Sequence, residues 1–126
     1  MDGILIVYKE KGYTSHDVVA KLRGILRQRK IGHTGTLDPQ AEGVLPVCLG
    51  NATKLCDMLT DRNKGYKAGV RLGIETDTQD IFGQVIKQTE CLVTEQQVTE
   101  TAESFIGEYD QIPPMYSAKK INGKKL

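Results

Sequence analysis

The sequence predicts an α+β fold built on a mixed sheet. Its expected elements follow the order β-α-β-α-β-β-α, and some strands alternate apolar and polar residues while others are continuously apolar. Neither internal repeats nor low-complexity linkers interrupt this order. The length of 126 residues, with 39% hydrophobic and 26% charged, is typical of a single soluble globular domain with its own core.

The first expected elements are a strand, a helix and a second strand. Residues 4–9 predict a short strand, and Thr14 or Ser15 caps the helix that follows. Residues 44–49 are a short apolar run bounded by glycines, which is typical of a buried strand. The helix is indicated by apolar residues that recur at helical spacing, namely Val18, Val19, Leu22, Ile25 and Leu26.

A short helix, two strands and a last helix complete the predicted order. Asn51 is expected to cap a helix that runs through Leu59. Apolar residues alternate with others over 66–74, which predicts a half-buried strand, and residues 82–87 are expected to lie beside it. Thr94 and Gln97 form a capping box for the last helix, which Gly107 ends. The short helix is expected to face inward with Leu55, Met58 and Leu59, and the last helix continues through Val98, Ala102, Phe105 and Ile106.

The charges are distributed unevenly, although the formal net charge is only +1. Residues 9–30 hold seven basic residues against two acidic ones, residues 119–125 add four lysines, and residues 90–110 hold six acidic residues and no basic one. This asymmetry indicates one side that faces a polyanion and another that faces solvent. The same residues would also suit the outer face of an exposed helix, so composition alone does not identify an RNA-binding protein.

The cysteines and the absence of long apolar runs predict a cytoplasmic protein. Cys48, Cys56 and Cys91 cannot all pair and have no Cys-x-x-Cys spacing, which favours reduced thiols. The apolar residues 4–7 are too few for the hydrophobic region of a signal peptide, and no basic segment precedes them.

Residues 32–46, with the sequence GHTGTLDPQAEGVLP, form the most informative stretch. Glycines, hydroxyl groups, one imidazole and one carboxylate occur here in a pattern too irregular for a core. Pro39 keeps Asp38 out of the helical region and fixes the next φ, so the carboxylate is held on a stiff turn. The pattern indicates an active-site loop. The alternative is an ordinary Asp-Pro turn whose carboxylate caps its own backbone.

The whole stretch resembles the signature G-H-T-G-T-L-D-P-x-A-x-G-V-L-P of the TruB family of tRNA pseudouridine synthases, at every specified position. A match of this length is far more specific than a short glycine-rich pattern. Other family motifs follow in the family's order. Residues 9–15 resemble K-P-x-G-x-T-S with Glu10 in place of proline, residues 64–73 resemble K-x-Y…L-G, residues 76–83 resemble T-D-T-x-D-x-x-G, and the tail 112–126 resembles P-P-x-Y-S-A-x-K-x-x-G.

The resemblance implies the pseudouridine synthase fold, a mixed and largely antiparallel sheet with flanking helices and a cleft across it. It also implies the isomerisation of a uridine in the T loop of tRNA (U55) to pseudouridine, with no cofactor and no metal. A carboxylate must act as nucleophile or base beside the flipped-out nucleotide, and this role falls on Asp38. Tyr66 matches the tyrosine that stacks on the target base, and His33 the histidine that fills the vacated space. From the residues alone, the alternatives are an ordinary strand-core tyrosine and a turn histidine.

Several lysines are expected to contact RNA phosphates, which predicts that binding weakens steeply as the salt concentration rises. Those in the tail begin the RNA-gripping loop that the family inserts after its P-P-x-Y-S-A motif. The expected contacts are Lys9, Lys11, Lys119, Lys120 and Lys124.

The family pattern continues beyond the tail motif and usually ends in an RNA-binding PUA domain. We therefore expect residues 1–126 to be the N-terminal portion of the catalytic domain, incomplete at the C-terminus and nearly inactive alone, with a monomeric full-length protein. One alternative is a non-catalytic module that binds or folds tRNA. Another is the catalytic subunit of a guide-RNA-dependent synthase, although Thr34 and the Val44–Pro46 ending favour the stand-alone bacterial type.

Other classes of site fit less well. A phosphate loop would end in Gly-Lys-Ser/Thr, and an aspartic protease would have Asp-Thr-Gly, whereas here Thr-Gly precedes the aspartate. A zinc site that used His16, His33 and a cysteine has no ligand spacing to support it.

Overall fold

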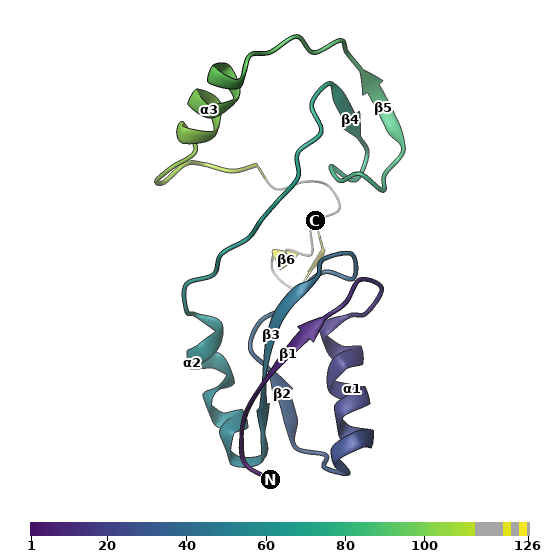
Figure 1. Cartoon of the computed structure of the whole chain (residues 1–126), viewed down its shortest axis with the longest axis vertical. Coiled ribbons are helices and arrows are strands. Elements are labelled where there is room, and N and C mark those ends of the chain that lie inside the picture. Colours follow the sequence, from purple (N-terminus) through teal and green to yellow (C-terminus); the bar gives the residue numbers. More distant parts are fainter. Residues whose placement is uncertain (113–119, 122–123, 126) are drawn as a thin grey trace. The chain divides into compact units, whose positions relative to one another are not determined.

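Antiparallel strand pairs and short helices build both units into which the chain divides. These units are Met1–Tyr66 and Lys67–Leu126. The computed structural model describes residues 1–112, 120–121 and 124–125 (Figure 1). Helices and strands occur together, so the predicted α+β class is confirmed.

The first unit contains a three-stranded antiparallel sheet, in the order β1 (Gly3–Lys9), β3 (Gly43–Leu49) and β2 (Ile31–His33). Lys9 lies opposite Gly43 at one end of the β1·β3 pair, and Leu49 lies opposite both Gly3 and Ile31 at the other. The strands expected at 4–9 and 44–49 are confirmed. The sequence does not predict β2, because a three-residue strand with a central glycine shows no alternating pattern.

Helix α1 (Ser15–Leu26) begins at a capping box, which confirms the predicted start. The Thr14 hydroxyl accepts a hydrogen bond from the Asp17 N–H (3.0 Å), and the Asp17 carboxylate accepts one from the Thr14 N–H (2.8 Å). The bonds that Thr14 donates, first from its side chain and then from its backbone, lower the pKa of Asp17. The helix ends where Arg27 adopts a left-handed conformation with φ +49°.

The core of this unit combines α1, the sheet and the loop between β2 and β3. Leu37, from that loop, packs on the core, so the loop is tied to the hydrophobic interior. The buried core residues are Val19, Ile31, Leu45, Val47 and Leu49, and the half-buried residues packed on them are Val7, Val18, Leu22, Leu26 and Leu37.

A 3₁₀ turn, η1 (Gly50–Leu55), leads directly into α2 (Cys56–Thr60), where the sequence predicts one helix. The predicted Asn51 cap is wrong. The capping position is Leu49, and the Asn51 N–H donates instead to the Asp2 carboxylate (2.5 Å). Leu59 is half-buried, but Leu55 and Met58, also expected inside, are exposed. The 3₁₀ turn has three residues per turn, so it rotates side chains away from the face that an α-helix would present.

Gly50 is a position where a side chain has no room. Its φ is +57°, and a Cβ would lie 2.6 Å from the Met1 carbonyl oxygen and against an Asp2 carboxylate oxygen. We expect Gly50→Ala to lower the free energy of unfolding by about 1–3 kcal/mol, measured by urea denaturation. Gly24→Ala is the matched control. Nothing lies within 4 Å of its Cβ, and alanine in a helix interior is worth about 0.5–1 kcal/mol. Equal effects at the two positions would contradict this prediction.

The second unit contains the antiparallel pair β4 (Ile74–Thr76) and β5 (Val85–Gln88). The neighbour expected at 82–87 is confirmed, although it begins later, at Val85. The strand expected over 66–74 is wrong for residues 66–73, which are not assigned to a strand in the described structure. An alternating pattern predicts that a segment is suited to a strand, but pairing with a neighbour decides where the strand forms. Here the strand begins only where the chain lies opposite β5.

The T-D-T-x-D-x-x-G motif closes this hairpin. The Asp80 carboxylate accepts hydrogen bonds from the Thr78 hydroxyl (2.7 Å) and from the N–H groups of Phe82 (2.8 Å) and Gly83 (3.1 Å). The bonds from Thr78 and then Phe82 lower the pKa of Asp80. Its contribution to stability is therefore present above its ordinary pKa and is lost as the pH falls through the lowered one. The motif has a structural role in this unit.

Helix α3 (Glu95–Glu103) begins at the predicted capping box, in which Gln97 N–H donates to Thr94 Oγ1 (3.2 Å) and Thr94 N–H to Gln97 Oε1 (2.9 Å). It ends at Glu103, earlier than the predicted end at Gly107. None of the described helices has the length and apolar character needed to cross a membrane. The last described strands are β6 (Lys120–Ile121) and β7 (Lys124–Lys125), which pair antiparallel.

Candidate active site

The loop that contains the signature is closed at its base by Thr34. This residue is buried, and both its N–H (3.1 Å) and its hydroxyl (3.3 Å) donate to the Pro46 carbonyl. The stretch 32–46 therefore starts in β2, ends in β3 and has its two ends bonded to each other. The sheet fixes where the loop begins and ends.

His33 is oriented by the loop itself. Its Nδ1 lies 2.7 Å from the Gly35 carbonyl oxygen, and because a carbonyl only accepts, Nδ1 carries the proton. Nε2 of the neutral ring is then left as an acceptor. Gly35 has φ +109°, a conformation that a side chain disfavours, and this turn brings its carbonyl onto the ring. His33 is half-buried.

The residue before Asp38 is held by Ser15. The buried Ser15 hydroxyl accepts a hydrogen bond from the Leu37 N–H (2.9 Å) and lies 3.3 Å from the Leu37 carbonyl, to which it donates. Ser15 is also the first residue of α1. One side chain therefore satisfies both backbone groups of Leu37 and fixes the loop to the start of the helix.

The residue after Asp38 is held by the segment between β1 and α1. The Pro39 carbonyl accepts hydrogen bonds from the Gly12 N–H (2.8 Å) and from Lys9 Nζ (3.4 Å). Lys9 is only 1% exposed, and its ammonium group also donates to the carbonyls of Tyr13 (2.6 Å) and Glu10 (3.1 Å). Residues 9–15 thus hold the Asp38 turn in place through these hydrogen bonds.

Asp38 lies between these two anchored neighbours and is itself exposed. Its carbonyl accepts a hydrogen bond from the Ala41 N–H (3.0 Å), which completes a tight turn. Within residues 1–112 its carboxylate makes no hydrogen bond to its own loop, so the alternative of a self-capping Asp-Pro turn is not what forms here. A solvent-facing carboxylate on a fixed backbone is suited to act as a nucleophile or a base.

Tyr66 is not placed against the other two predicted site residues. It is 73% exposed, and among the described contacts its ring is paired with neither His33 nor Asp38. Lys64, two residues earlier, reaches the loop, because its Cε lies 3.6 Å from where a Cβ on Gly35 would be. His33 and Asp38 therefore lie in one loop, and Tyr66 lies two residues beyond Lys64, which reaches that loop.

The lysines expected to contact RNA differ in their surroundings. Lys9 is buried and holds three carbonyls, so this structure leaves its ammonium no access to a phosphate, and we remove it from the proposed RNA contacts. Lys11 is exposed. Lys119 lies outside the described residues, and for Lys120 and Lys124 only the backbone, in β6 and β7, is described.

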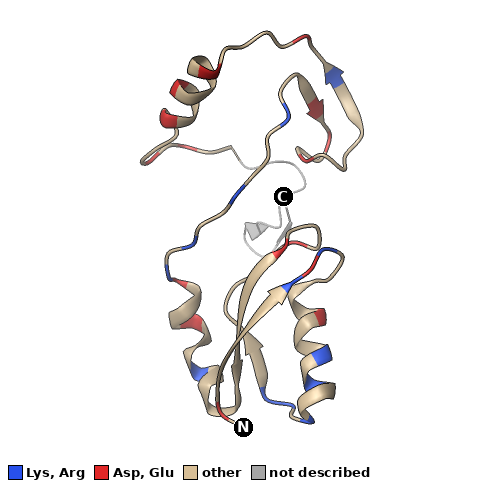
Figure 2. Cartoon of the chain, in the orientation of Figure 1, with Lys and Arg blue, Asp and Glu red and all other residues tan. Residues whose placement is uncertain are grey.

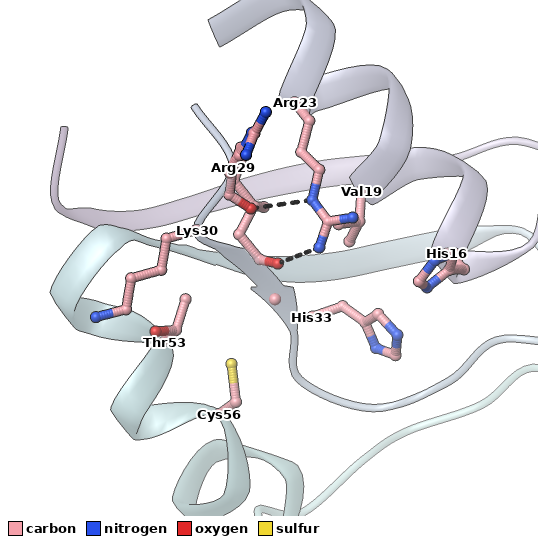
Figure 3. Close-up of a pocket in the computed structure, with 10 residues that line it drawn as sticks. His16, Val19, Arg23, Arg29, Lys30, His33, Thr53 and Cys56 are labelled. Carbon is pink, nitrogen blue, oxygen red and sulfur yellow. Dashed lines mark hydrogen bonds between the residues drawn. The ribbon is translucent and has the colours of Figure 1, made fainter. Parts of the chain in front are cut away.

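An open cavity of about 510 Å³ lies beside His33 (Figure 3). The sequence does not single it out, because its residues come from α1, the loop between α1 and β2, β2 itself, η1 and α2, and they meet only in the fold. Within the described residues no three His, Cys, Asp or Glu side chains gather as metal ligands would. The cavity residues are His16, Val19, Arg23, Arg29, Lys30, Ile31, Gly32, His33, Thr53 and Cys56.

Charged residues also separate between the elements (Figure 2). Helix α1 carries Asp17 in its first turn and then Lys21 and Arg23, whereas α3 carries Glu95, Glu100 and Glu103 and no basic residue. The second half of α1 is therefore cationic and α3 is acidic.

The three free cysteines differ in exposure, and this difference predicts their order of reaction. Cys91 is exposed, Cys56 half-buried and Cys48 buried. Burial, with a smaller effect of the neighbouring Cys56, raises the pKa of the Cys48 thiol to about 11. Because the thiolate is the reactive form, we expect iodoacetamide at neutral pH to label Cys91 first and Cys48 only after unfolding. Mass spectrometry of timed samples measures the order, and early labelling of Cys48 would contradict it.

Comparisons with known proteins identify the family of the chain. Residues 23–126 match the TruB family pseudouridylate synthase (N terminal domain). The chain is 65% identical over its whole length to tRNA pseudouridine synthase B of Lachnoclostridium phytofermentans and 56% identical to that of Alkaliphilus oremlandii, and it covers 41% and 42% of those proteins. It also resembles a chain in the crystal structure of a Cbf5-Nop10-Gar1 complex, with a TM-score of 0.63 and 31% identity over 94% of this chain and 31% of that one.

The chain therefore belongs to the TruB family of pseudouridylate synthases. It spans about two fifths of the length of the curated relatives that it matches.

Proposed function

We propose that the complete product of the gene that encodes this chain converts a uridine in the T loop of tRNA (U55) to pseudouridine, with Asp38 as the essential carboxylate. The observation that carries the proposal is the Asp38 turn. Its carboxylate is exposed, while hydrogen bonds to Leu37 and Pro39 fix the backbone on either side. A carboxylate held in this way loses little entropy on meeting its substrate.

The reaction is an isomerisation in which no atom is added or lost. The C–N glycosidic bond of the uridine breaks, the uracil turns, a C–C bond forms to its carbon 5, and the proton on that carbon moves to solvent or to a base while the released nitrogen gains one. Asp38 acts as nucleophile or base beside the sugar and the uracil. The chemistry needs neither a redox step nor an external group.

The target nucleotide must leave the folded RNA before Asp38 reaches it. Flipping a base out of its stack costs a few kcal/mol, which the enzyme offsets with its own contacts. We propose that Tyr66 stacks on the flipped uracil, since an exposed ring suits a base that has lost its neighbours. His33, fixed through Nδ1, fills the space that the uridine leaves.

Residues 1–126 are, in this proposal, the N-terminal portion of a catalytic domain that a PUA domain follows. The match of residues 23–126 to the N terminal domain model of the family supports the first part of this assignment. We also propose that the whole protein is a cytoplasmic monomer whose partner is the T arm of tRNA. Lys11, Lys119, Lys120 and Lys124 are its proposed phosphate contacts, so tRNA binding should weaken as salt rises.

The test is to incubate the complete gene product with unmodified tRNA and to map pseudouridine. The control substrate is the same tRNA with cytidine at the target position of the T loop. We expect modification at that one position of the first tRNA and at no position of the second. Modification elsewhere would contradict the substrate assignment, and tRNA binding without any modification would favour a non-catalytic binding or folding module. Modification only with an added guide RNA would favour the guide-dependent alternative.

A further inference from the structure

We propose that the cavity beside His33 binds a backbone phosphate of the RNA substrate. We call it the cationic cavity, defined by Arg23, Arg29 and Lys30 together with His16 and His33. The inference rests on the proposed function for the identity of the ligand, and it names a binding site that the signature loop does not reveal.

The charge of the cationic cavity selects an anion. Three residues with cationic side chains, Arg23, Arg29 and Lys30, are among its lining residues, and no aspartate or glutamate is. The imidazoles of His16 and His33 are the other polar side chains with ring nitrogens among the lining residues. Clustered cations that a carboxylate does not neutralise attract phosphate, and each phosphate contact releases counterions from a nucleic acid.

Arg23 is fixed in place before any ligand arrives. Its Nε donates to the Arg29 carbonyl (3.1 Å) and its Nη2 to the Ile31 carbonyl (3.4 Å), so the guanidinium is held against the backbone that leads into β2 (Figure 3). A guanidinium has five N–H donors in a fixed plane, and these two bonds leave others for a phosphate. A donor of this kind loses little side-chain entropy on binding.

The size and position of the cavity agree with a nucleotide backbone. Its volume of about 510 Å³ falls in the range of small-ligand sites, and it is open, so a polymer can pass across it. His33 belongs both to the cavity and to the loop that carries Asp38. An RNA strand whose uridine is flipped toward Asp38 would therefore pass the cavity on its way through the site.

The experiment compares two variants of the complete gene product that lose the same charge. Arg29→Gln/Lys30→Gln removes two cations of the cavity and leaves Arg23, which braces β2, intact. Arg27→Gln/Lys54→Gln removes two nearby exposed cations that do not line it. Binding of unmodified tRNA is measured over a range of chloride concentrations, and circular dichroism confirms that each variant is folded. A third variant, Arg29→Lys/Lys30→Arg, keeps both charges.

We expect the cavity variant to bind tRNA about tenfold more weakly, with a log–log salt slope shallower by about one, while the charge-matched control keeps most of its affinity and slope. The charge-retaining variant should restore both. Equal losses in the cavity variant and the control would overturn the proposal, because the cations would then act only through the general field. A cavity variant that binds as the wild type does would overturn it too.

Two further readouts separate related possibilities. Inorganic phosphate in place of chloride, at equal ionic strength, should weaken tRNA binding by the wild type more than by the cavity variant. If phosphate weakens tRNA binding by the wild type more than by the cavity variant while the two proteins have the same salt slope, the cavity binds free phosphate and the RNA assignment is overturned. Binding needs no turnover, so a wild type that binds with the expected slope but forms no pseudouridine refutes the proposed function alone.

Discussion

The Asp38→Asn variant of the complete gene product is expected to form pseudouridine at least about a thousandfold more slowly than the wild type, which is the scale of a positioned acid–base or nucleophilic group. The amide has nearly the shape of the carboxylate but neither its charge nor its basicity. Pseudouridine is mapped in unmodified tRNA under single-turnover conditions, so that product release does not hide the chemical step.

This loss should leave folding and tRNA binding intact. The hydrogen bonds that hold the turn are made to the backbone of Leu37, Asp38 and Pro39 and not to the Asp38 carboxylate. Glu42→Gln is the matched control, since it neutralises another carboxylate of the same loop. Full activity of Asp38→Asn, or an equal loss in both variants, would refute the catalytic role of Asp38.

The second large effect is expected at Lys9. Lys9→Met keeps the length and apolar stem of the side chain but removes the donor that the carbonyls of Glu10, Tyr13 and Pro39 share. Leaving these carbonyls without a hydrogen-bond donor destabilises the folded state, and we expect the free energy of unfolding to fall by about 2–4 kcal/mol. Urea denaturation of the 126-residue chain measures this change.

Because Pro39 is one of those carbonyls, Lys9→Met should also slow pseudouridine formation in the complete gene product, while the affinity for tRNA changes little. Lys54→Met is the control, since Lys54 is exposed, has the same charge and is not among the proposed phosphate contacts. If Lys9 were instead a phosphate ligand, its substitution would change the salt slope of tRNA binding and leave stability unaltered. That result would contradict the bracing role of Lys9.

Local signals in the sequence predict the elements that depend on neighbouring residues. The capping boxes at Thr14 and Thr94 need only a hydroxyl and an acceptor three residues later, and both helices begin where these pairs predict. The 44–49 strand is likewise predicted by its own apolar run. In the site, the signature predicts that His33 and Asp38 share one loop.

Features that depend on distant pairing are not predictable in this way. β2 exists because β3 lies beside it, and residues 66–73 have the pattern of a strand but form none in the described structure. A lysine in a basic stretch reads as a phosphate ligand, yet Lys9 is buried by a loop thirty residues further along the chain. The hydrogen bonds between Ser15 and Leu37, and the cationic cavity, also arise only when separate segments meet.

Helix α1 contributes residues to both parts of the proposed site, the Asp38 turn and the cationic cavity. Ser15, its first residue, holds the Asp38 turn, and Arg23, two turns further on, borders the cationic cavity. An α-helix advances about 1.5 Å and turns about 100° per residue, so one inserted residue between them would move Arg23 to another side of the helix. The spacing of eight residues therefore determines on which side of the helix Arg23 lies relative to Ser15. We expect conservative substitutions within α1 to be tolerated and single-residue insertions or deletions between these two residues not to be.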